Sequence, residues 1–197
     1  MGSPAVERKK LLSIEAGARI LRQGGVVAYP TEGVFGLGCD PFQWSAVQRI
    51  LRLKGRPSGK GLILLAADFS MVEPWIKPLT PELRSRVFGT WPGPVTWLMP
   101  ARPELPAWIR GAHDTVAVRV TGHPVASALS QAASMPIVST SANQSGEEPL
   151  RTAQAIHDHF VFGLDGVVEG ALGLLEGPTE IRDALTGCVI RTGGTVR

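Results

Sequence analysis

The sequence is poor in the features that mark several common protein classes. Among its 197 residues are two cysteines, Cys39 and Cys188, too few for a disulfide framework or a cysteine-based metal site. We expect both to be buried thiols. The longest apolar run, Leu62 to Ala67, is far shorter than the roughly 20 residues that a membrane helix needs. Residues 1–10 lack the apolar centre of a signal peptide and are expected to form a flexible N-terminus. These absences predict a cytoplasmic protein without membrane association.

Negative charge is missing from one stretch. Residues 41–67 contain no aspartate or glutamate, yet they hold five cations: Arg49, Arg52, Lys54, Arg56 and Lys60. We call these five residues the positive patch. A solvated helix face is one interpretation, although such a face normally mixes both signs. Contacts to phosphate or carboxylate are the other. Aromatic residues make up only 6% of the chain, which argues against stacking of single-stranded bases.

Familiar nucleotide-binding and catalytic motifs are also missing. The stretch GRPSGKG, Gly55 to Gly61, is too short between its glycines for a P-loop and lacks the serine or threonine that should follow. GVFGLG, Gly33 to Gly38, has the wrong spacing for the dinucleotide fingerprint. No Gly-x-Ser-x-Gly elbow occurs. Metal-ligand spacing is not found among the histidines, which are His113, His123, His157 and His159. Any nucleotide site must therefore be built differently, and we expect no metal held by protein ligands alone.

Helical and strand-like segments alternate along the chain. Apolar residues at helical spacing predict helices at 14–23, 43–54, 80–88, 123–133 and 152–160. Apolar runs and alternation predict strands at 26–30, 62–67, 91–100, 115–120, 136–140, 167–168 and 188–191. A glycine-punctuated loop is expected after Pro30. The pattern predicts a single α/β domain over residues 11–197, with a twisted mixed β-sheet flanked by helices.

Polar side chains lie near the ends of the predicted strands. In an α/β sheet the carboxyl ends of strands converge on a ligand crevice, where hydroxyls and amides can bind phosphate or ribose while cations neutralise charge. The candidates are Thr31, Lys54, Arg56, Thr115, Arg119, Ser139, Ser141, Asn143, Thr179 and Arg191. Each also has a structural interpretation: the STSAN segment could be an Asx-turn that caps a helix, and Arg119 could be a surface strand residue. Their joint pattern favours one shared site.

Five segments resemble, in the same order, those of one known family. They are YPTEGVFGLGCD, LRLKGRPSGKGLIL, WPGPVTWLMPA, DTVAVRVTGHPVASAL and PIVSTSANQSGEEPLRT. Together they make the chain similar, over nearly its whole length, to the YrdC-like threonylcarbamoyl-AMP synthases, and most of all to their short bacterial form. The resemblance implies a YrdC-like fold with a deep concave ligand cavity. It also implies that L-threonine, bicarbonate and ATP give threonylcarbamoyl-AMP and pyrophosphate, for the modification of a tRNA adenosine.

The resemblance assigns roles to the candidates. The family's Lys-x-Arg motif falls on Lys54 and Arg56, which are expected to be catalytic by stabilising charge on the phosphates of ATP. The expected ATP-binding residues are Lys54, Arg56, Thr115, Ser139, Ser141, Asn143 and Arg191. The expected threonine-binding residues are Thr31, Arg119 and Thr179. Mg²⁺ would enter with ATP, and the proteins that transfer the threonylcarbamoyl group onward are implied partners.

The chain departs from the longer relatives in two respects. Those relatives follow the basic motif with Asn-Pro and end the next strand in histidine, whereas this chain has Lys60-Gly61 and Leu65 there. They also carry an extra C-terminal domain, for which no residues remain here; if that domain closes the cavity in the longer relatives, another segment must close it here.

Two other functions remain open at this stage. A double-stranded RNA-binding maturation factor would hold the nucleic-acid backbone with the positive patch, and tRNA or double-stranded RNA could also be a partner of the enzyme. A sugar-phosphate lyase on a similar fold would need clustered metal-binding carboxylates, which the sequence does not show. Pyrophosphate release that depends on threonine separates the synthase from both.

Overall fold

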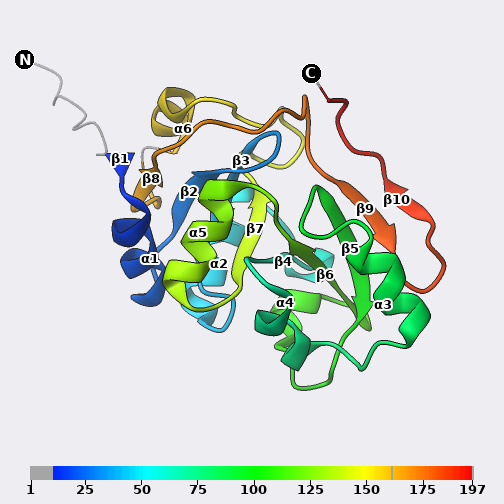
Figure 1. Ribbon diagram of the computed structural model, residues 1–197. Coiled ribbons are helices and arrows are strands. Elements are labelled where there is room, and N and C mark those ends of the chain that lie inside the picture. The colour runs from blue at the N-terminus through cyan, green and yellow to red at the C-terminus, as the bar shows by residue number, and fades with distance from the viewer. Residues whose placement is uncertain (1–10, 161, 197) are drawn as a thin grey trace, which may run out of the picture.

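The protein is built on one twisted, open β-sheet with helices on its faces, as Figure 1 shows. The computed structural model describes residues 11–160 and 162–196, so the predicted flexibility of residues 1–10 lies outside the described residues. Parallel and antiparallel strand pairs both occur. In spatial order the strands are β1 (Leu11–Leu12), β8 (Gly166–Val168), β2 (Val27–Pro30), β3 (Phe35–Gly38), β7 (Ile137–Ser141), β4 (Ile63–Ala66), β6 (Thr115–Val120), β5 (Val95–Pro100), β9 (Glu180–Asp183) and β10 (Val189–Arg191). The predicted α/β domain with a mixed sheet is confirmed.

The helices begin and end where local signals place them. They are α1 (Ile14–Arg22), α2 (Trp44–Lys54), α3 (Pro81–Phe88), α4 (Ala107–Arg110), α5 (Pro124–Ala133) and α6 (Ala153–His159), with short 3₁₀ helices η1 (Ser58–Lys60), η2 (Phe69–Met71) and η3 (Glu73–Trp75). Ser13, Thr80 and Thr152 each cap a helix by accepting a backbone N–H. Gly55 ends α2 in the left-handed conformation (φ 57°). The five predicted helices are confirmed to within one or two residues.

Both faces of the sheet are buried. Helices α1 and α5 cover one face, where Leu21 and Leu129 pack together with the inward side chains of the strands. Helix α2 packs on the other face through Ile50. Because successive side chains of a strand point to opposite faces, Leu64 belongs to the second core and its neighbour Leu65 to the first. This agrees with the prediction that residues 62–67 form a strand buried on both sides.

Residues 35–38, which the sequence places in a loop, form the buried strand β3 between β2 and β7. The prediction was wrong because glycine normally weakens a strand, and this one contains two. The two glycines leave room for the ring of Tyr29. A Cβ on Gly38 would lie 2.7 Å from Cε1 of Tyr29, and one on Gly36 would lie 3.3 Å from Cζ. Tyr29 is fully buried, and its hydroxyl donates a hydrogen bond to the carbonyl of Val138.

Smaller differences bear on the site. Strand β7 extends to Ser141, so Ser139 and Ser141 lie within a strand and not beyond its end. Strands β1 and β9 and helix α4 were not predicted. Cys39 is buried as expected, but Cys188 is exposed because it follows the turn between β9 and β10 at the edge of the sheet. Within residues 11–160 and 162–196, no helix is both long enough and apolar enough to cross a bilayer.

Candidate active site

A cavity of about 510 Å³ opens between the turn after β2, the end of α2, strands β6 and β7, and the segment that contains β9 and β10. All ten candidate residues from the sequence line it: Thr31, Lys54, Arg56, Thr115, Arg119, Ser139, Ser141, Asn143, Thr179 and Arg191. The fold thus brings together polar groups from the first third and the last third of the chain. Their individual roles remain predictions.

The charge of the cavity wall is one-sided. Its described residues include Lys54, Arg56, Lys60, Arg110, Arg119 and Arg191, and no aspartate or glutamate is among them. We refer to Lys54, Arg56, Lys60, Arg110 and Arg191 as the cationic cluster. A wall of one sign raises the local concentration of ligands of the opposite sign. The cavity is therefore suited to an anionic ligand.

Lys54, the last residue of α2, is almost fully buried, with 3% of its surface exposed. Its ammonium donates to the carbonyl of Ser141, to the carbonyl of Asn143 at 2.8 Å and to Oδ1 of Asn143 at 3.1 Å. The three acceptors match the three N–H bonds of a lysine ammonium. Burial, and secondly the charge of Arg56, lower the pKa of Lys54 to about 8.

Arg56 and Arg191, the two arginines of the cationic cluster that the sequence predicts as site residues, have fewer hydrogen-bond acceptors than Lys54. Nη2 of Arg56 donates to the carbonyl of Gly61 at 2.9 Å, while its buried Nε has no hydrogen-bond partner among the described residues. Arg191 donates from Nη2 to the carbonyl of Thr179 at 2.7 Å. Burial lowers the pKa of both guanidinium groups, and Arg119 and Arg56 lower that of Arg191 further. These cations lie close enough to repel one another, which a bound anion would relieve.

Two cations and a histidine in the wall were not among the predicted site residues. Lys60 belongs to the positive patch, but the sequence did not predict that it lines the cavity. Arg110 is the last residue of the unpredicted helix α4, and His113 lies shortly after it. Nη1 of Arg110 donates to the carbonyl of His113. Hydrogen bonds from Leu62 to the carbonyl of Ile109 and from Ala112 to the carbonyl of Gly59 join the two segments. No local sequence pattern indicated this contact between distant loops.

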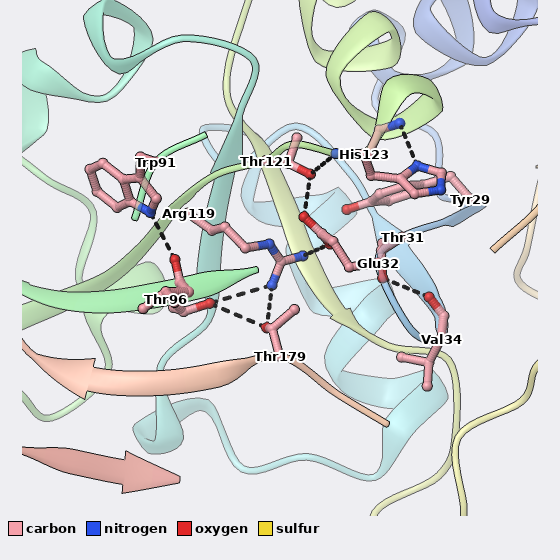
Figure 2. A network of polar contacts seen from close by, with 12 residues as sticks. Tyr29, Thr31, Glu32, Val34, Trp91, Thr96, Arg119, Thr121, His123 and Thr179 are labelled. Atoms are coloured by element: carbon pink, nitrogen blue, oxygen red, sulfur yellow. Dashed lines mark hydrogen bonds and ion pairs between the residues drawn. The ribbon is translucent and has the colours of Figure 1, made fainter. Parts of the chain in front are cut away.

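A second group, which we call the paired cluster, consists of Thr31, Glu32, Arg119 and Thr179 (Figure 2). Nη2 of Arg119 lies 3.5 Å from Oε2 of Glu32, and both side chains are at least nine-tenths buried. Nη1 of Arg119 donates to the hydroxyl of Thr179 at 2.6 Å. Arg119 is therefore not the surface residue that its place in an alternating strand allowed. A buried guanidinium needs such a partner because an unpaired buried charge is costly.

A hydrogen bond from Thr121 orients the carboxylate of Glu32. The hydroxyl of Thr121 donates to Oε1 of Glu32 at 2.6 Å and accepts from the backbone N–H of His123. Burial lowers the pKa of His123, which favours the neutral ring. Its Nδ1 accepts from the N–H of Ala126, so Nε2 carries the proton and donates to the carbonyl of Ala171 at 3.1 Å. Glu32 and Thr121 do not line the cavity, and Thr121 was not predicted as a site residue.

The turn between β2 and β3 presents Thr31 to the cavity in a fixed orientation. The hydroxyl of Thr31 donates to the carbonyl of Val34 at 2.7 Å, so its oxygen remains an acceptor for a ligand N–H or O–H. A Cβ on Gly33 would lie 2.0 Å from the carbonyl oxygen of Gly177. Glycine is thus required where this turn packs on the segment that leads to Thr179.

The positive patch does not exist as one surface. Arg49 pairs with Asp165 at 2.9 Å, Lys54 is buried, and Arg56 lines the cavity. Only Arg52 and Lys60 are exposed members of the patch. The residues are therefore divided between the surface, the interior and the cavity, which removes the continuous basic face that a nucleic-acid backbone needs. Across residues 11–160 and 162–196, no group of three or more histidine, cysteine, aspartate or glutamate side chains is placed to hold a metal ion.

A mixed α/β sheet with a cavity rich in cations is suited to an anionic small molecule. Residues 19–193 match the family profile of Sua5, YciO and YrdC, described as "Telomere recombination", and the chain belongs to this family. A protein of Nitrosococcus oceani named threonylcarbamoyl-AMP synthase is 52% identical over 178 residues, which cover 90% of this chain and 96% of that protein. One of Coxiella burnetii with the same name is 50% identical over 179 residues, 91% and 96% of the two chains.

Solved structures agree with this assignment. P. abyssi Sua5 complexed with L-threonine has a TM-score of 0.85 and 32% identity, and the match covers 91% of this chain but 54% of that one. E. coli YciO has a TM-score of 0.80 and 29% identity, with 93% and 91% of the two chains covered. The chain thus spans about half the length of the Sua5 structure and nearly all of YciO.

Proposed function

We propose that this protein is a threonylcarbamoyl-AMP synthase, which forms threonylcarbamoyl-AMP and pyrophosphate from L-threonine, bicarbonate and ATP. Relatives with this name are about 50% identical to it over nine-tenths of its length. The structural observation that carries the proposal is a cavity in which a cationic cluster adjoins a charge-balanced paired cluster. A polyanionic nucleotide suits the first, and a zwitterionic amino acid suits the second.

In this proposal the phosphates of ATP bind at the cationic cluster through Arg56 and Arg191. Arg56 has a buried Nε without a partner among the described residues, and Arg191 has an exposed side chain, so both have donors for phosphate oxygens. The remaining polar groups of the wall would bind the ribose and base: Thr115, Ser139, Ser141 and Asn143.

Threonine would bind at the paired cluster. The oxygen of Thr31 can accept a hydrogen bond from the substrate's amine or hydroxyl, since its own proton is donated to Val34. Arg119 would face the substrate carboxylate, and Thr179 would stand beside it. The L-threonine complex of P. abyssi Sua5 supports this choice of amino acid.

The reaction needs no covalent protein nucleophile. The amine of threonine and bicarbonate condense to a carbamate with loss of water. A carbamate oxygen then forms a bond to the α-phosphorus of ATP, and the bond from that phosphorus to the bridging oxygen breaks to release pyrophosphate. Holding the reactants in line can supply about 7–11 kcal/mol of the barrier. Cations directed at the phosphates stabilise the charge that builds on the leaving pyrophosphate. Exclusion of water would protect the carbamate.

The same proposal covers the remaining partners. Mg²⁺ would arrive as part of the ATP substrate. The product is a mixed anhydride that hydrolyses in water, so proteins that transfer its threonylcarbamoyl group to a tRNA adenosine would receive it in the cytoplasm. RNA binding by the protein itself is not favoured, because the positive patch is divided among three environments.

Pyrophosphate release from ATP tests the function. We expect release only when threonine and bicarbonate are both present, and a fall of about 100-fold in Arg56→Met, since a lost charge contact at the reacting phosphates costs this much or more. Arg52→Met is the matched control, because Arg52 is exposed on α2 and does not line the cavity. Release that does not depend on threonine would overturn the proposal. Salt-sensitive binding of double-stranded RNA without such release would support the RNA-binding alternative.

A further inference from the structure

We propose that Lys54 is a positioning residue for the nucleotide site, and that it acts by fixing the loop after β7 without contacting phosphate. This inference rests on the proposed function for the identity of the ligand. The family's Lys-x-Arg motif invites the opposite expectation, in which Lys54 and Arg56 contact phosphate side by side. The two side chains have different surroundings, and the difference assigns them different tasks.

The ammonium of Lys54 is already saturated by acceptors from the loop. The carbonyls of Ser141 and Asn143 and the side-chain Oδ1 of Asn143 all lie within hydrogen-bond distance of Nζ. A phosphate oxygen could approach Nζ only by displacing one of them. The carbonyl of Ser141 would keep the N–H of Asn143 as a donor and Oδ1 of Asn143 would keep the hydroxyl of Ser141, but the buried carbonyl of Asn143 would lose the donor that Lys54 provides. Lys54 is also 3% exposed, whereas Arg56 is half-buried and Arg191 is exposed.

The loop depends on Lys54 at both its side chain and its backbone. The N–H of Ser145 donates to the carbonyl of Lys54 at 3.0 Å. Oδ1 of Asn143, which Nζ binds, also accepts from the hydroxyl of Ser141 at 2.6 Å. Nδ2 of Asn143 donates to the carbonyl of Glu147 at 2.6 Å. Lys54 therefore orients Asn143, and Asn143 in turn sets Ser141 and the residues up to Glu147.

This arrangement explains why a lysine is needed at this position. Two carbonyls and one amide oxygen converge on a single point, and an ammonium is the side-chain group that offers three donors from one atom. Arginine would present a planar fork that does not match such a convergent set. The positive charge near the phosphates is then a secondary effect of Lys54, and Arg56 provides the direct contact.

Hydrogen exchange and pyrophosphate binding, both measured without turnover, test the assignment. The amide of Ser145 donates to the carbonyl of Lys54 and the amide of Leu150 to the carbonyl of Ala142, so both report on the loop. In ligand-free Lys54→Met we expect these two amides to exchange at least about tenfold faster, because the loop opens more often. Arg56→Met should leave those amides unchanged and lower the affinity for inorganic pyrophosphate about tenfold or more, as expected of a charge-assisted contact. Unchanged loop exchange in Lys54→Met, with a loss of pyrophosphate affinity as large as that of Arg56→Met, would overturn the proposal.

A measurement on the unaltered protein guards against a Lys54→Met chain that fails to fold. With ¹⁵N-labelled lysine and arginine, addition of pyrophosphate should shift the Nε resonance of Arg56 and leave the Nζ resonance of Lys54 nearly unchanged. A shift of the Lys54 resonance as large as that of Arg56 would contradict the positioning role. If pyrophosphate binds as expected but none is released from ATP in the presence of both threonine and bicarbonate, the proposed function fails while the role of Lys54 stands.

Discussion

The paired cluster and the cationic cluster meet at one cavity, which Glu32 does not line, and the two clusters differ in how their charges are balanced. Arg119 in the paired cluster has a buried carboxylate, Glu32, as its partner. Among the residues that the structure describes, the hydrogen-bond acceptors of Lys54, Arg56 and Arg191 in the cationic cluster are backbone and amide oxygens. The first arrangement is neutral before any ligand binds, and the second is not. A neutral zwitterion and a polyanion need this difference in their binding sites.

The two clusters also differ in their electrostatic cost to the ligand-free protein. The buried pair of Arg119 and Glu32 is charge-balanced and can exist without a ligand, while Nε of Arg119 and Oε2 of Glu32 have no hydrogen-bond partner among the described residues. Burial, and after it the charges of Arg119 and Arg56, lower the pKa of Arg191, and the repulsion from these two charges is a cost that the bound nucleotide would remove. We therefore expect changes in the paired cluster to affect stability first, and changes in the cationic cluster to affect ligand binding first.

Glu32→Gln should have the largest effect on stability. It leaves the guanidinium of Arg119 buried without a counter-charge, and breaking a buried ion pair in this way typically costs about 3–5 kcal/mol. We expect a loss of this size in the free energy of unfolding, measured with denaturant. The KM for threonine should rise in any protein that remains folded, while the KM for ATP changes little.

Glu180→Gln is the matched control for this prediction. Glu180 pairs with Arg182 on β9, where both side chains are partly exposed. Such a pair is worth about 1 kcal/mol or less. Equal losses of stability in the two variants would show that burial does not distinguish the paired cluster, and the comparison would fail.

The pH dependence of stability gives an effect of intermediate size at Lys54. Burial and Arg56 lower the pKa of Lys54 from 10.5 to about 8 in the folded protein. Between these values the unfolded chain binds more protons than the folded one, so this group raises stability as the pH rises. We expect the unfolding free energy of the unaltered protein, relative to Lys54→Met, to increase by about 1–2 kcal/mol from about pH 7.5 to pH 9.5.

Activity should change in the opposite direction over the same range. A neutral amine has two N–H bonds for three acceptors, so the loop at Ser141 and Asn143 loses one contact. Pyrophosphate release should therefore fall as stability rises. A parallel rise of both would show that the ammonium form of Lys54 does not support the loop.

The sequence was sufficient for the helices and for most strands, because helical periodicity, caps and apolar runs are local signals. Strand β3 was missed because its glycines serve a distant contact, the ring of Tyr29 on the neighbouring strand. Helix α4 and strand β9 are short elements whose positions depend on pairing with remote segments. Local propensity cannot report such requirements.

The site shows the same division between local and distant information. Residues with an evident chemical function, such as Arg56 and Asn143, could be found because their motifs are contiguous. Thr121 and Arg110 could not be assigned, because Thr121 acts on Glu32, 89 residues away in the sequence, and Arg110 reaches the cavity through a contact between loops. Even for Lys54, the sequence predicts its location but not the direction of its ammonium.

Arg49→Met should have the smallest effect and delimits the cationic cluster. Arg49 belongs to the same acid-free stretch as Lys54 and Arg56, but it pairs with Asp165 on the surface, and each side chain is about a third exposed (36% and 37%). The pair should contribute less than about 1 kcal/mol to stability. Arg49 is the better residue to change, because Asp165 also accepts a hydrogen bond from the N–H of Val26 at 2.7 Å.

For Arg49→Met we expect unchanged pyrophosphate release and an unfolding free energy within about 1 kcal/mol of the unaltered protein. A tenfold loss of release would mean that positive charge outside the cavity also serves the reaction, and the boundary drawn around the cationic cluster would be wrong.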